Sequence, residues 1–326
     1  MIIDTSNTLP TREMLFDDLF SPSEENKLYF RMFATAWAKW LDMSPEEFEA
    51  AAERLSDKGV KEELIQRAES GPMSMDNFVK QLKQAGITYS AVHNMDEQNA
   101  TGSALPNDYV ADILNKYPDQ FIGFTGFNPH KGKKSLDEAE RALTRLGLRA
   151  VVFRPFMHRL FANDPKYYPL YALCEDLGAP IWIHTSVNWA TNQSIYYGHP
   201  KYLEQVLIDF PKLKIIAGHG GWPWIPDIVI MLWKYENLFV DTSAHRPRYV
   251  AKPNTGWDMF LHFANSTIQD KILFGSDWVS MGMDIGDVIR EVNEWPLKPH
   301  VKEKLFWKNA LRVFNLEEKS KYISQE

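Results

Sequence analysis

The stretch YLEQVLIDFPKLKIIAGHGG, residues 202–221, contains one complete unit of the fold. Its first part has the apolar spacing of an amphipathic helix, and Pro211 follows where that helix should stop. Residues 213–218 form a short and nearly continuous apolar run, which is typical of a parallel strand covered on both faces. The run leads directly to His219. The stretch therefore predicts a helix followed by a strand that carries an imidazole at its carboxyl end.

The same unit recurs along the chain from about residue 74 onward. The sequence predicts strands over residues 2–6, 87–94, 121–129, 148–155, 179–186, 213–221, 237–244 and 271–279. Eight strands separated by helices in a chain of 326 residues predict an α/β fold, the (β/α)8 TIM barrel. A doubly wound open sheet is the alternative, but no G-x-G-x-x-G loop follows the first strand. We therefore expect the closed barrel.

Residues 11–70 interrupt this alternation. They contain no strand candidate and have the pattern of two or three charged amphipathic helices. Their aromatic residues recur at nearly helical spacing, which favours a packing face: Phe16, Phe20, Tyr29, Phe30, Phe33, Trp37 and Trp40. An insertion after strand 1 emerges at the carboxyl end of the barrel, so a lid or a dimer contact is a second expected role. We expect residues 1–326 to form a single barrel domain with this helical insertion.

Composition and charge narrow the class of protein. Hydrophobic residues make up 44% of the chain and charged residues 24%, the balance of a globular protein with a sizeable core. The net charge is −7 without a basic block, so we expect no nucleic-acid partner. A single cysteine, Cys174, fits a reducing cytoplasm. No signal peptide precedes Met1 and no apolar run approaches the ~18 residues of a membrane span, so we expect a cytoplasmic protein.

Three strand ends carry side chains that can bind a metal or transfer a proton. His184 and His219 end the strands at 179–186 and 213–221, and Asp277 ends the strand at 271–279. Glycines on both sides of His219 favour a close approach of the backbone to a ligand or metal. Each residue also has an ordinary explanation, because a histidine can be a core residue and an aspartate can cap the next helix. Together they form the His–His–Asp set, which could hold a divalent metal or perform acid–base catalysis.

At these blocks the sequence resembles a known family. PIWIHTS, IIAGHGGWPWIPDIV, NLFVDTSA and KILFGSDWV are similar to blocks of the amidohydrolase-related TIM-barrel enzymes. The nearest branch includes aminocarboxymuconate-semialdehyde decarboxylase and γ-resorcylate decarboxylase, and the resemblance covers roughly residues 74–316 plus the first strand. It implies that His184 and Asp277 are metal ligands and that His219 is an acid–base residue or a further ligand. It also implies a homodimer.

The first strand departs from the family pattern. That strand usually ends D-x-H-x-H, and alignment on Asp4 places Ser6 and Thr8 at the two histidine positions. Neither neutral hydroxyl replaces an imidazole as a zinc ligand. Either the His–His–Asp set holds a divalent metal such as Zn²⁺ together with water, or these residues act without a metal, which the loss of the pair favours. A third alternative is an oxygen ligand from Asp4 or Asn7.

Cationic residues after two strands are candidates for binding an acidic substrate. Arg154 ends the strand at 148–155, and Arg246 follows the strand at 237–244. An arginine at such a position can stabilise a carboxylate or a developing negative charge. For Arg154 the alternative is a structural ion pair with a neighbouring carboxylate of the barrel.

Aromatic and polar residues of the predicted rim complete the candidate site. Trp189 and Trp222 follow strands 5 and 6, which favours a flat, unsaturated or aromatic substrate, although packing against the insertion is the alternative. Ser6 and Asn7 should face the pocket from the first strand. His93 is expected to be a satisfied polar residue rather than a catalyst.

These patterns lead to three functional alternatives. The resemblance favours non-oxidative decarboxylation of a small aromatic or ring-derived carboxylate. Hydrolysis of a lactone, an amide or another carbon–heteroatom bond in a small cyclic metabolite is the second alternative. The third is a catalytically inactive barrel that binds a ligand, which the missing histidine pair favours and the intact His–His–Asp set disfavours. In each case we expect a small-molecule partner and no organic cofactor.

Overall fold

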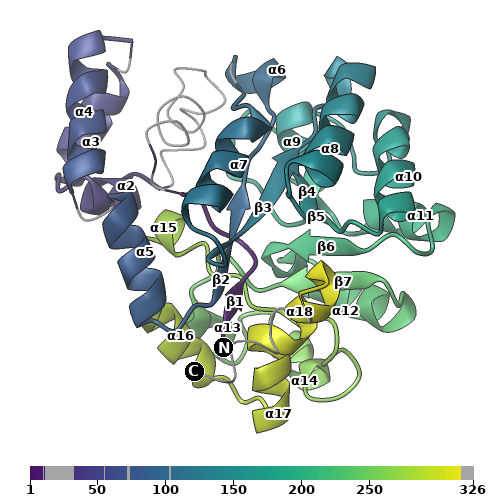
Figure 1. Cartoon of the computed structure of the whole chain (residues 1–326). Helices are drawn as coiled ribbons and strands as arrows, with labels where there is room; N and C mark the ends of the chain where they lie inside the picture. The colour runs from purple at the N-terminus through teal and green to yellow at the C-terminus, as the bar shows by residue number, and fades with distance from the viewer. Residues whose placement is uncertain (10, 12–32, 55, 72–73, 103, 317–326) are drawn as a thin grey trace.

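The computed structural model contains the eight predicted strands, and they form the barrel. It describes residues 1–9, 11, 33–54, 56–71, 74–102 and 104–316. Within these ranges no helix is both long and apolar enough to cross a membrane. The strands, shown in Figure 1, are β1 Ile3–Asp4, β2 Tyr89–His93, β3 Phe121–Gly126, β4 Ala150–Phe153, β5 Ile181–His184, β6 Ile215–Gly218, β7 Leu238–Asp241 and β8 Ile272–Leu273.

All eight strands are parallel and pair in chain order from β1 to β8. The two ends of the sheet meet beyond the short strands β1 and β8. There the backbone N–H and the hydroxyl of Thr5 both donate to the carbonyl oxygen of Phe274, at 2.9 and 3.0 Å. One step further, the N–H of Asp277 donates to the carbonyl oxygen of Ser6 at 2.9 Å. These bonds place the first and last strand ends side by side.

Helices follow the strands as the sequence predicts. The longer ones between strands are α5 Met75–Gln84, α7 Asn107–Lys116, α8 Lys133–Arg145, α10 Tyr168–Leu177, α11 Lys201–Asp209, α12 Ile225–Lys234 and α14 Asp258–Ala264. Shorter turns of helix lie in the loops: α6 Gln98–Thr101, η3 Pro129–Lys131, α9 Pro155–His158, η4 Pro165–Tyr167, η5 Ile195–Gly198, η6 His219–Gly221, α13 Pro247–Val250 and α15 Trp278–Met281. After α15, the described part of the chain continues with α16 Ile285–Asn293, α17 Pro299–Glu303, η7 Lys304–Lys308 and α18 Asn309–Phe314.

The core has two layers, because successive residues of a strand point to opposite faces. In β5, Trp182 belongs to the cluster inside the barrel, while Ile181 and Ile183 pack outward against the helices. Its neighbour in register on β6, Ile216, also points inward. Both faces of each strand are therefore buried, which explains the nearly continuous apolar runs in the sequence. Helix α18 contributes to the inner cluster, where Phe314 contacts Phe124 with ring centroids 5.6 Å apart.

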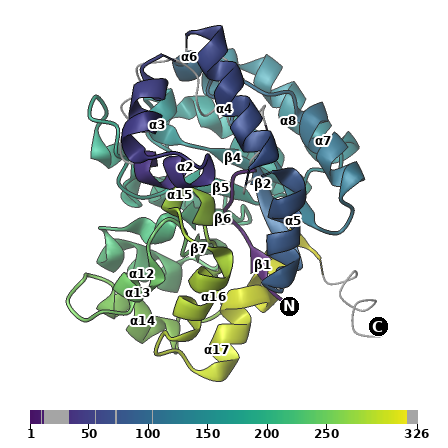
Figure 2. The same cartoon turned by 90° about the vertical axis from the view of Figure 1, so that its left-hand side faces the viewer.

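The described part of the insertion is helical, as predicted. It contains α2 Ala34–Trp40, α3 Pro45–Ala52 and α4 Lys58–Ser70, whereas Phe16, Phe20, Tyr29 and Phe30 lie outside the described residues. Helix α2 lies beside α15, which follows the last strand (Figure 2). The indole N–H of Trp40 donates to the carbonyl oxygen of Val279 at 2.8 Å, and its ring contacts Trp278 edge to face at 5.4 Å. The predicted packing role is thus confirmed at Trp40, which is buried.

Candidate active site

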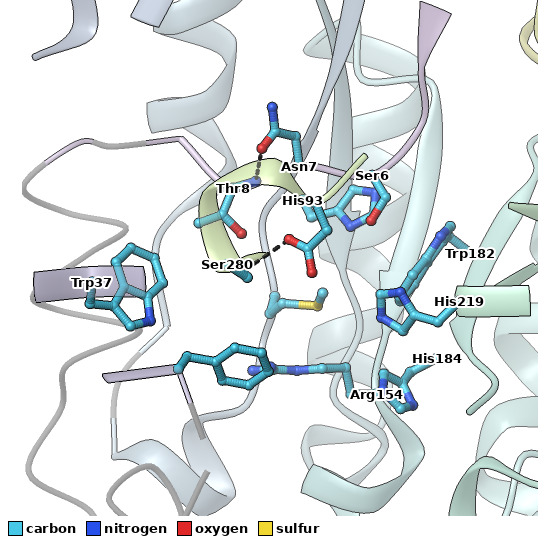
Figure 3. A pocket seen from close by; sticks show the side chains of 13 residues that line it. Ser6, Asn7, Thr8, Trp37, His93, Arg154, Trp182, His184, His219 and Ser280 are labelled. Carbon is cyan, nitrogen blue, oxygen red and sulfur yellow. Dashed lines mark hydrogen bonds between the residues drawn. The ribbon is translucent and has the colours of Figure 1, made fainter. Parts of the chain in front are cut away.

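A pocket of about 60 Å³ lies where the carboxyl ends of the strands meet the insertion. Phe33, at the N-cap of helix α2, and Trp37 of that helix contribute an aromatic wall, and strands β2 and β5 and the loops after β1, β2, β4, β6 and β8 contribute the rest. Figure 3 shows His184, His219 and Trp182 on one side of the pocket, Trp37 on the other, and Arg154 reaching between them. The lining residues are Ser6, Asn7, Thr8, Phe33, Trp37, His93, Met95, Arg154, Trp182, His184, His219, Asp277 and Ser280.

The structure brings the two predicted histidines together. His184 is the last residue of β5 and pairs in register with Gly218, so His219 lies one residue further along the neighbouring strand. Their ring centroids are 4.8 Å apart. Burial lowers the pKa of His219 to about 3, and the Arg154 charge acts in the same direction. Burial also lowers the pKa of His184 well below its usual range, so both rings are neutral at neutral pH.

Asp277 enters the same pocket from the loop after β8. It occupies the N-cap position of α15, yet its side chain makes no capping hydrogen bond, so helix capping does not explain this residue. Instead its Oδ1 accepts a hydrogen bond from the Ser280 hydroxyl at 2.9 Å. Burial raises the pKa of Asp277 to about 6, and the nearby charge of Asp241 adds to this effect. The protonated form of Asp277 is consequently accessible near neutral pH.

Arg154 lines the pocket and also forms a buried ion pair. Its Nε lies 2.5 Å from Oε1 of Glu97, and its Nη2 bonds Oε2 of the same residue. The Glu97 side chain is 1% exposed and the Arg154 side chain 13%. The structural pair expected as the alternative for Arg154 is confirmed. It does not remove the guanidinium from the pocket, where its positive charge helps to keep both imidazoles neutral.

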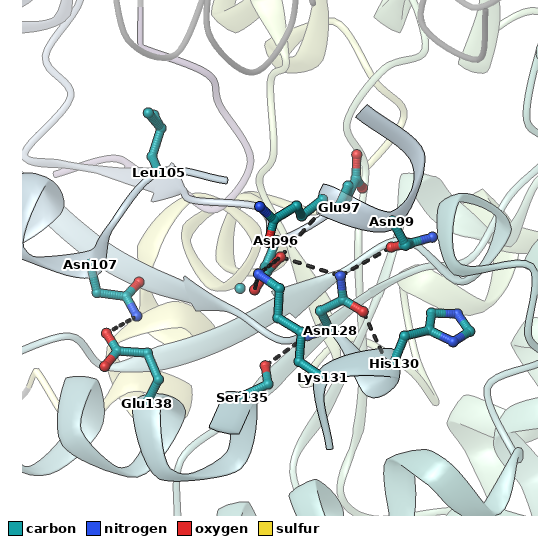
Figure 4. Close-up of polar contacts among 12 residues, drawn as sticks. Asp96, Glu97, Asn99, Leu105, Asn107, Asn128, His130, Lys131, Ser135 and Glu138 are labelled. Carbon is teal, nitrogen blue, oxygen red and sulfur yellow. Dashed lines mark hydrogen bonds and ion pairs between the residues drawn. The ribbon is translucent and has the colours of Figure 1, made fainter. Parts of the chain in front are cut away.

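Glu97 is supported by a polar cluster outside the pocket, drawn in Figure 4. Asp96, the residue before it, accepts two hydrogen bonds from Nζ of Lys131, both at 2.7 Å. The amide of Asn128, after β3, donates to Asp96 at 3.3 Å and to Asn99 of α6 at 3.0 Å. These contacts fix the loop after β2 against the loop after β3. The loop position of Glu97, whose carboxylate pairs with Arg154, is thereby fixed.

The rim after β1 faces the pocket through Ser6, Asn7 and Thr8. Asp4 does not line the pocket, because its carboxylate turns toward the loop after β8. It accepts hydrogen bonds from the N–H of Ser276 at 2.8 Å, from the Ser276 hydroxyl, and from the N–H of Ser6 at 3.3 Å. Burial raises the pKa of Asp4 to about 7. Asp4 thus joins the first strand to the last.

The donor set does not match the metal site that the resemblance implies. Among the described residues, no group of three His, Cys, Asp or Glu side chains gathers closely enough to hold a metal. The oxygens of Asp4 are occupied by Ser276 and Ser6, and hydroxyls stand at the two first-strand histidine positions. The cationic Arg154 beside the histidines also opposes a dication. The residues present therefore do not fit that metal.

Three predicted substrate contacts lie elsewhere, since none of them is among the lining residues. Arg246 forms an ion pair with Glu291 at 3.1 Å. Trp189 lies on the loop after β5 and is 41% exposed, and Trp222 packs on His245 with ring centroids 5.5 Å apart. In each case the loop carries the side chain away from the pocket, and the path of the loop depends on contacts with residues distant in sequence.

His93 and Trp182 are among the lining residues that were not assigned to the pocket from sequence. His93 donates from Nε2 to the carbonyl oxygen of Thr5 at 3.0 Å, so it is a satisfied polar residue that also lines the pocket. The sequence pattern indicates only that Trp182 belongs to an apolar strand. In the structure its indole lines the pocket, and the indole N–H donates to Asp241. Period-2 alternation offered a signal, because Trp182 stands two residues before His184 and so shares its face.

The glycines on both sides of His219 lie close to two indole rings. A Cβ on Gly218 would lie 2.1 Å from Cζ2 of Trp182, and a Cβ on Gly220 would lie 2.1 Å from Cη2 of Trp257. Gly220 also has φ +71, a conformation that favours glycine. The absent side chains thus make room for two indole rings. Close packing therefore accounts for Gly218 and Gly220, and the expected close approach to a ligand or metal remains a prediction.

Gly218→Ala is expected to destabilise the protein by about 1–3 kcal/mol, because the new methyl group must displace the Trp182 ring. Urea denaturation of the variant and the wild type measures the difference. Gly286→Ala is the control, since a Cβ there meets nothing within 4 Å and the position lies in helix α16. It should be neutral or stabilising by up to about 1 kcal/mol. Equal stability of both variants would contradict the packing explanation.

Comparison with known protein families gives one match over most of the chain. The family described as Amidohydrolase matches residues 34–316. Among curated relatives, the γ-resorcylate decarboxylase of Rhizobium sp. (strain MTP-10005) is 23% identical over 263 residues, covering 65% of this chain and 75% of that protein. The 2-amino-3-carboxymuconate-6-semialdehyde decarboxylase of Dictyostelium discoideum is 30% identical over 130 residues, covering 35% of this chain and 36% of that protein.

Solved structures share the architecture at low sequence identity. An uncharacterised TIM-barrel protein from Bordetella bronchiseptica has a TM-score of 0.70 and 24% identity, covering 96% of this chain and 97% of that one. A dihydroxybenzoic acid decarboxylase from Polaromonas sp. JS666, solved with manganese and an inhibitor, has a TM-score of 0.63 and 19% identity, covering 97% of both chains. At these identities the likeness establishes the fold.

Proposed function

This chain belongs to the amidohydrolase family, as an enzyme of the carboxy-lyase or hydrolase class, and on that premise we propose that it decarboxylates a small aromatic or ring-derived carboxylate without an oxidant. One observation carries the proposal. A cation, a carboxyl group with a raised pKa and two neutral imidazoles line a single pocket. Relatives named γ-resorcylate decarboxylase and 2-amino-3-carboxymuconate-6-semialdehyde decarboxylase support this reaction over the alternatives.

Arg154 gives the pocket its affinity for an anion. Glu97 holds two of its guanidinium nitrogens, so the group is oriented before a substrate arrives. A substrate carboxylate beside this cation is stabilised more strongly in the buried pocket than it would be in water. Neutral His184 and His219 add hydrogen-bonding nitrogens without adding charge. They can accept from hydroxyl or amino groups on the substrate ring.

Asp277 supplies the proton that decarboxylation requires. In its protonated form it donates to the ring carbon that bears the carboxylate, and the new C–H bond uses a π-electron pair of the ring. The C–C bond to the carboxylate then breaks, its electron pair returns to the ring, and carbon dioxide leaves. Asp277, now a carboxylate, regains a proton from water. The raised pKa of Asp277 suits this role, because the acid form persists closer to neutral pH.

We propose that this chemistry proceeds without the metal of the family pattern, since the donor set does not fit it. The predicted insertion 11–70 is proposed to cover the pocket, because Phe33 and Trp37 form part of its wall. The cavity of about 60 Å³ is smaller than the roughly 150 Å³ that holds benzene in a protein core, so a ring must displace lining side chains. The homodimer, the cytoplasmic location and the single-domain organisation remain predictions.

A substrate panel tests the proposal. The purified enzyme is incubated with 2,6-dihydroxybenzoate, 5-carboxyvanillate and 2-amino-3-carboxymuconate-6-semialdehyde, and carbon dioxide and product are measured with and without a chelator. We expect one equivalent of carbon dioxide per substrate consumed, and rates that the chelator leaves unchanged. Uptake of water by a lactone or amide would indicate the hydrolase instead. Binding without any turnover would indicate the inactive barrel, and a stoichiometric metal needed for activity would overturn the metal-free mechanism.

A further inference from the structure

Asp241, at the end of β7, organises the environment of His219 from outside the pocket. Its Oδ1 accepts from the backbone N–H of His219 at 2.9 Å and from the N–H and hydroxyl of Ser243 at 3.1 and 2.6 Å. Its Oδ2 accepts from the indole N–H of Trp182. All four partners are donors, and the side chain is fully buried. Asp241 therefore acts as an ionised acceptor with no proton of its own to donate.

This arrangement determines how Ser243 is oriented. The Ser243 hydroxyl has one proton, and the 2.6 Å contact with a carboxylate oxygen requires that proton. The same hydroxyl oxygen lies 2.7 Å from Nδ1 of His219. Because its proton is already committed to Asp241, Ser243 can only accept there. The hydrogen of the neutral imidazole must then reside on Nδ1 of His219.

We propose that Asp241 and Ser243 are positioning residues that fix His219 as the Nδ1–H tautomer, with the lone pair on Nε2 facing the substrate. Ser243 and Asp241 do not line the pocket, whereas His219 does, so the nitrogen opposite Nδ1 is the one on the pocket side. Such a relay makes His219 a hydrogen-bond acceptor toward the substrate. It also prevents the ring from presenting an N–H there instead. The inference rests on the proposed function only for the identity of the substrate.

The backbone of His219 is held by the same carboxylate. His219 has φ +63, which is uncommon for a residue with a side chain, and its N–H points to Asp241. One group thus fixes both the main chain and, through Ser243, the ring orientation of His219. The Trp182 indole, packed against the His219 ring with centroids 5.1 Å apart, is tied to the same carboxylate. Ser243 and Trp182 thus confine the ring before substrate binds.

Nitrogen NMR of the ring tests the tautomer directly. Wild-type protein labelled with ¹⁵N-histidine should show a protonated Nδ1 and an unprotonated Nε2 for His219 at neutral pH. His219→Gln identifies the resonances by their disappearance. A wild-type spectrum with the proton on Nε2 would overturn the inference, whatever reaction the enzyme catalyses. This measurement needs no substrate, so its outcome is separate from that of the substrate panel.

Ser243→Ala tests the consequence for turnover of 2,6-dihydroxybenzoate, or of whichever panel compound is consumed. We expect a loss of the single tautomer and a fall in kcat of about 10- to 100-fold, the scale for removing an orienting partner, with KM changed less than about twofold. Thr242→Val is the control, because its buried hydroxyl donates to the carbonyl oxygen of Leu273 at 3.4 Å rather than to His219. It should retain the tautomer and the rate. A Ser243→Ala enzyme with wild-type kcat would overturn the inference.

Discussion

Asp277→Asn is expected to lower kcat for decarboxylation by about 10²- to 10⁴-fold, the contribution of a general acid. The asparagine amide keeps the size and the contact with Ser280 but has no acidic proton to deliver to the ring carbon. KM should change little, since the positive charge of Arg154 remains in place. Asp284→Asn is the control, because Asp284 is an exposed carboxylate near the same loop and forms a surface ion pair with Lys39. It should stay within about twofold of wild type.

The pH dependence of kcat supplies a second readout for the same residue. If protonated Asp277 is the acid, kcat is highest at low pH and falls as the pH rises through the pKa of the bound enzyme. That pKa is about 6 in the free protein because of burial, and a substrate carboxylate nearby raises it further. The falling limb should therefore lie at pH 6 or above, and Asp277→Asn should lack it. A variant that keeps this limb, or retains a wild-type rate, would show that another group donates the proton.

The strand ends were the most predictable part of the site. Each strand is short and apolar, so its last polar residue is easy to locate, and the carboxyl ends of parallel strands meet at one end of a barrel. This geometry places His184, His219, Asp277 and Arg154 in one pocket although they are distant in sequence. The first-strand rim residues also reach the pocket by the same rule. The fold and the strand-end residues of the site can therefore be predicted from the local sequence pattern, together with the rule that the carboxyl ends of parallel strands meet at one end of a barrel.

Residues on the longer loops were not predictable in this way. Arg246 turns to Glu291 of α16, a partner 45 positions away that no local pattern announces. Trp189 follows its loop to the surface, while Trp37 reaches the pocket from an insertion whose path depends on tertiary packing. The role of Asp241 could not be predicted either, because it follows from the groups that donate hydrogen bonds to its buried carboxylate. Side-chain networks of this kind depend on contacts across the barrel rather than on spacing along the chain.

Arg154→Met is expected to destabilise the protein by about 3–5 kcal/mol, because it leaves the buried Glu97 carboxylate without its ionic partner. Urea denaturation at neutral pH measures the loss. Adding Glu97→Gln in the same chain removes the uncompensated charge and should restore most of the stability. Arg290→Met is the matched control, since that arginine is 60% exposed in its ion pair with Asp287. It should cost no more than about 1 kcal/mol.

The double variant Arg154→Met, Glu97→Gln separates the two roles of Arg154. If the guanidinium also binds the substrate carboxylate, the refolded double variant remains defective, with KM raised about tenfold or more, in line with the loss of a charged hydrogen bond. A stable double variant with wild-type kinetics would mean that Arg154 serves the fold alone. The substrate anion would then need another cation, and Arg246 is excluded from the pocket by its pairing with Glu291. Stability and KM thus respond independently. The stability depends on whether the charges of residues 97 and 154 compensate each other, whereas KM depends on a positive charge at residue 154 in the pocket wall.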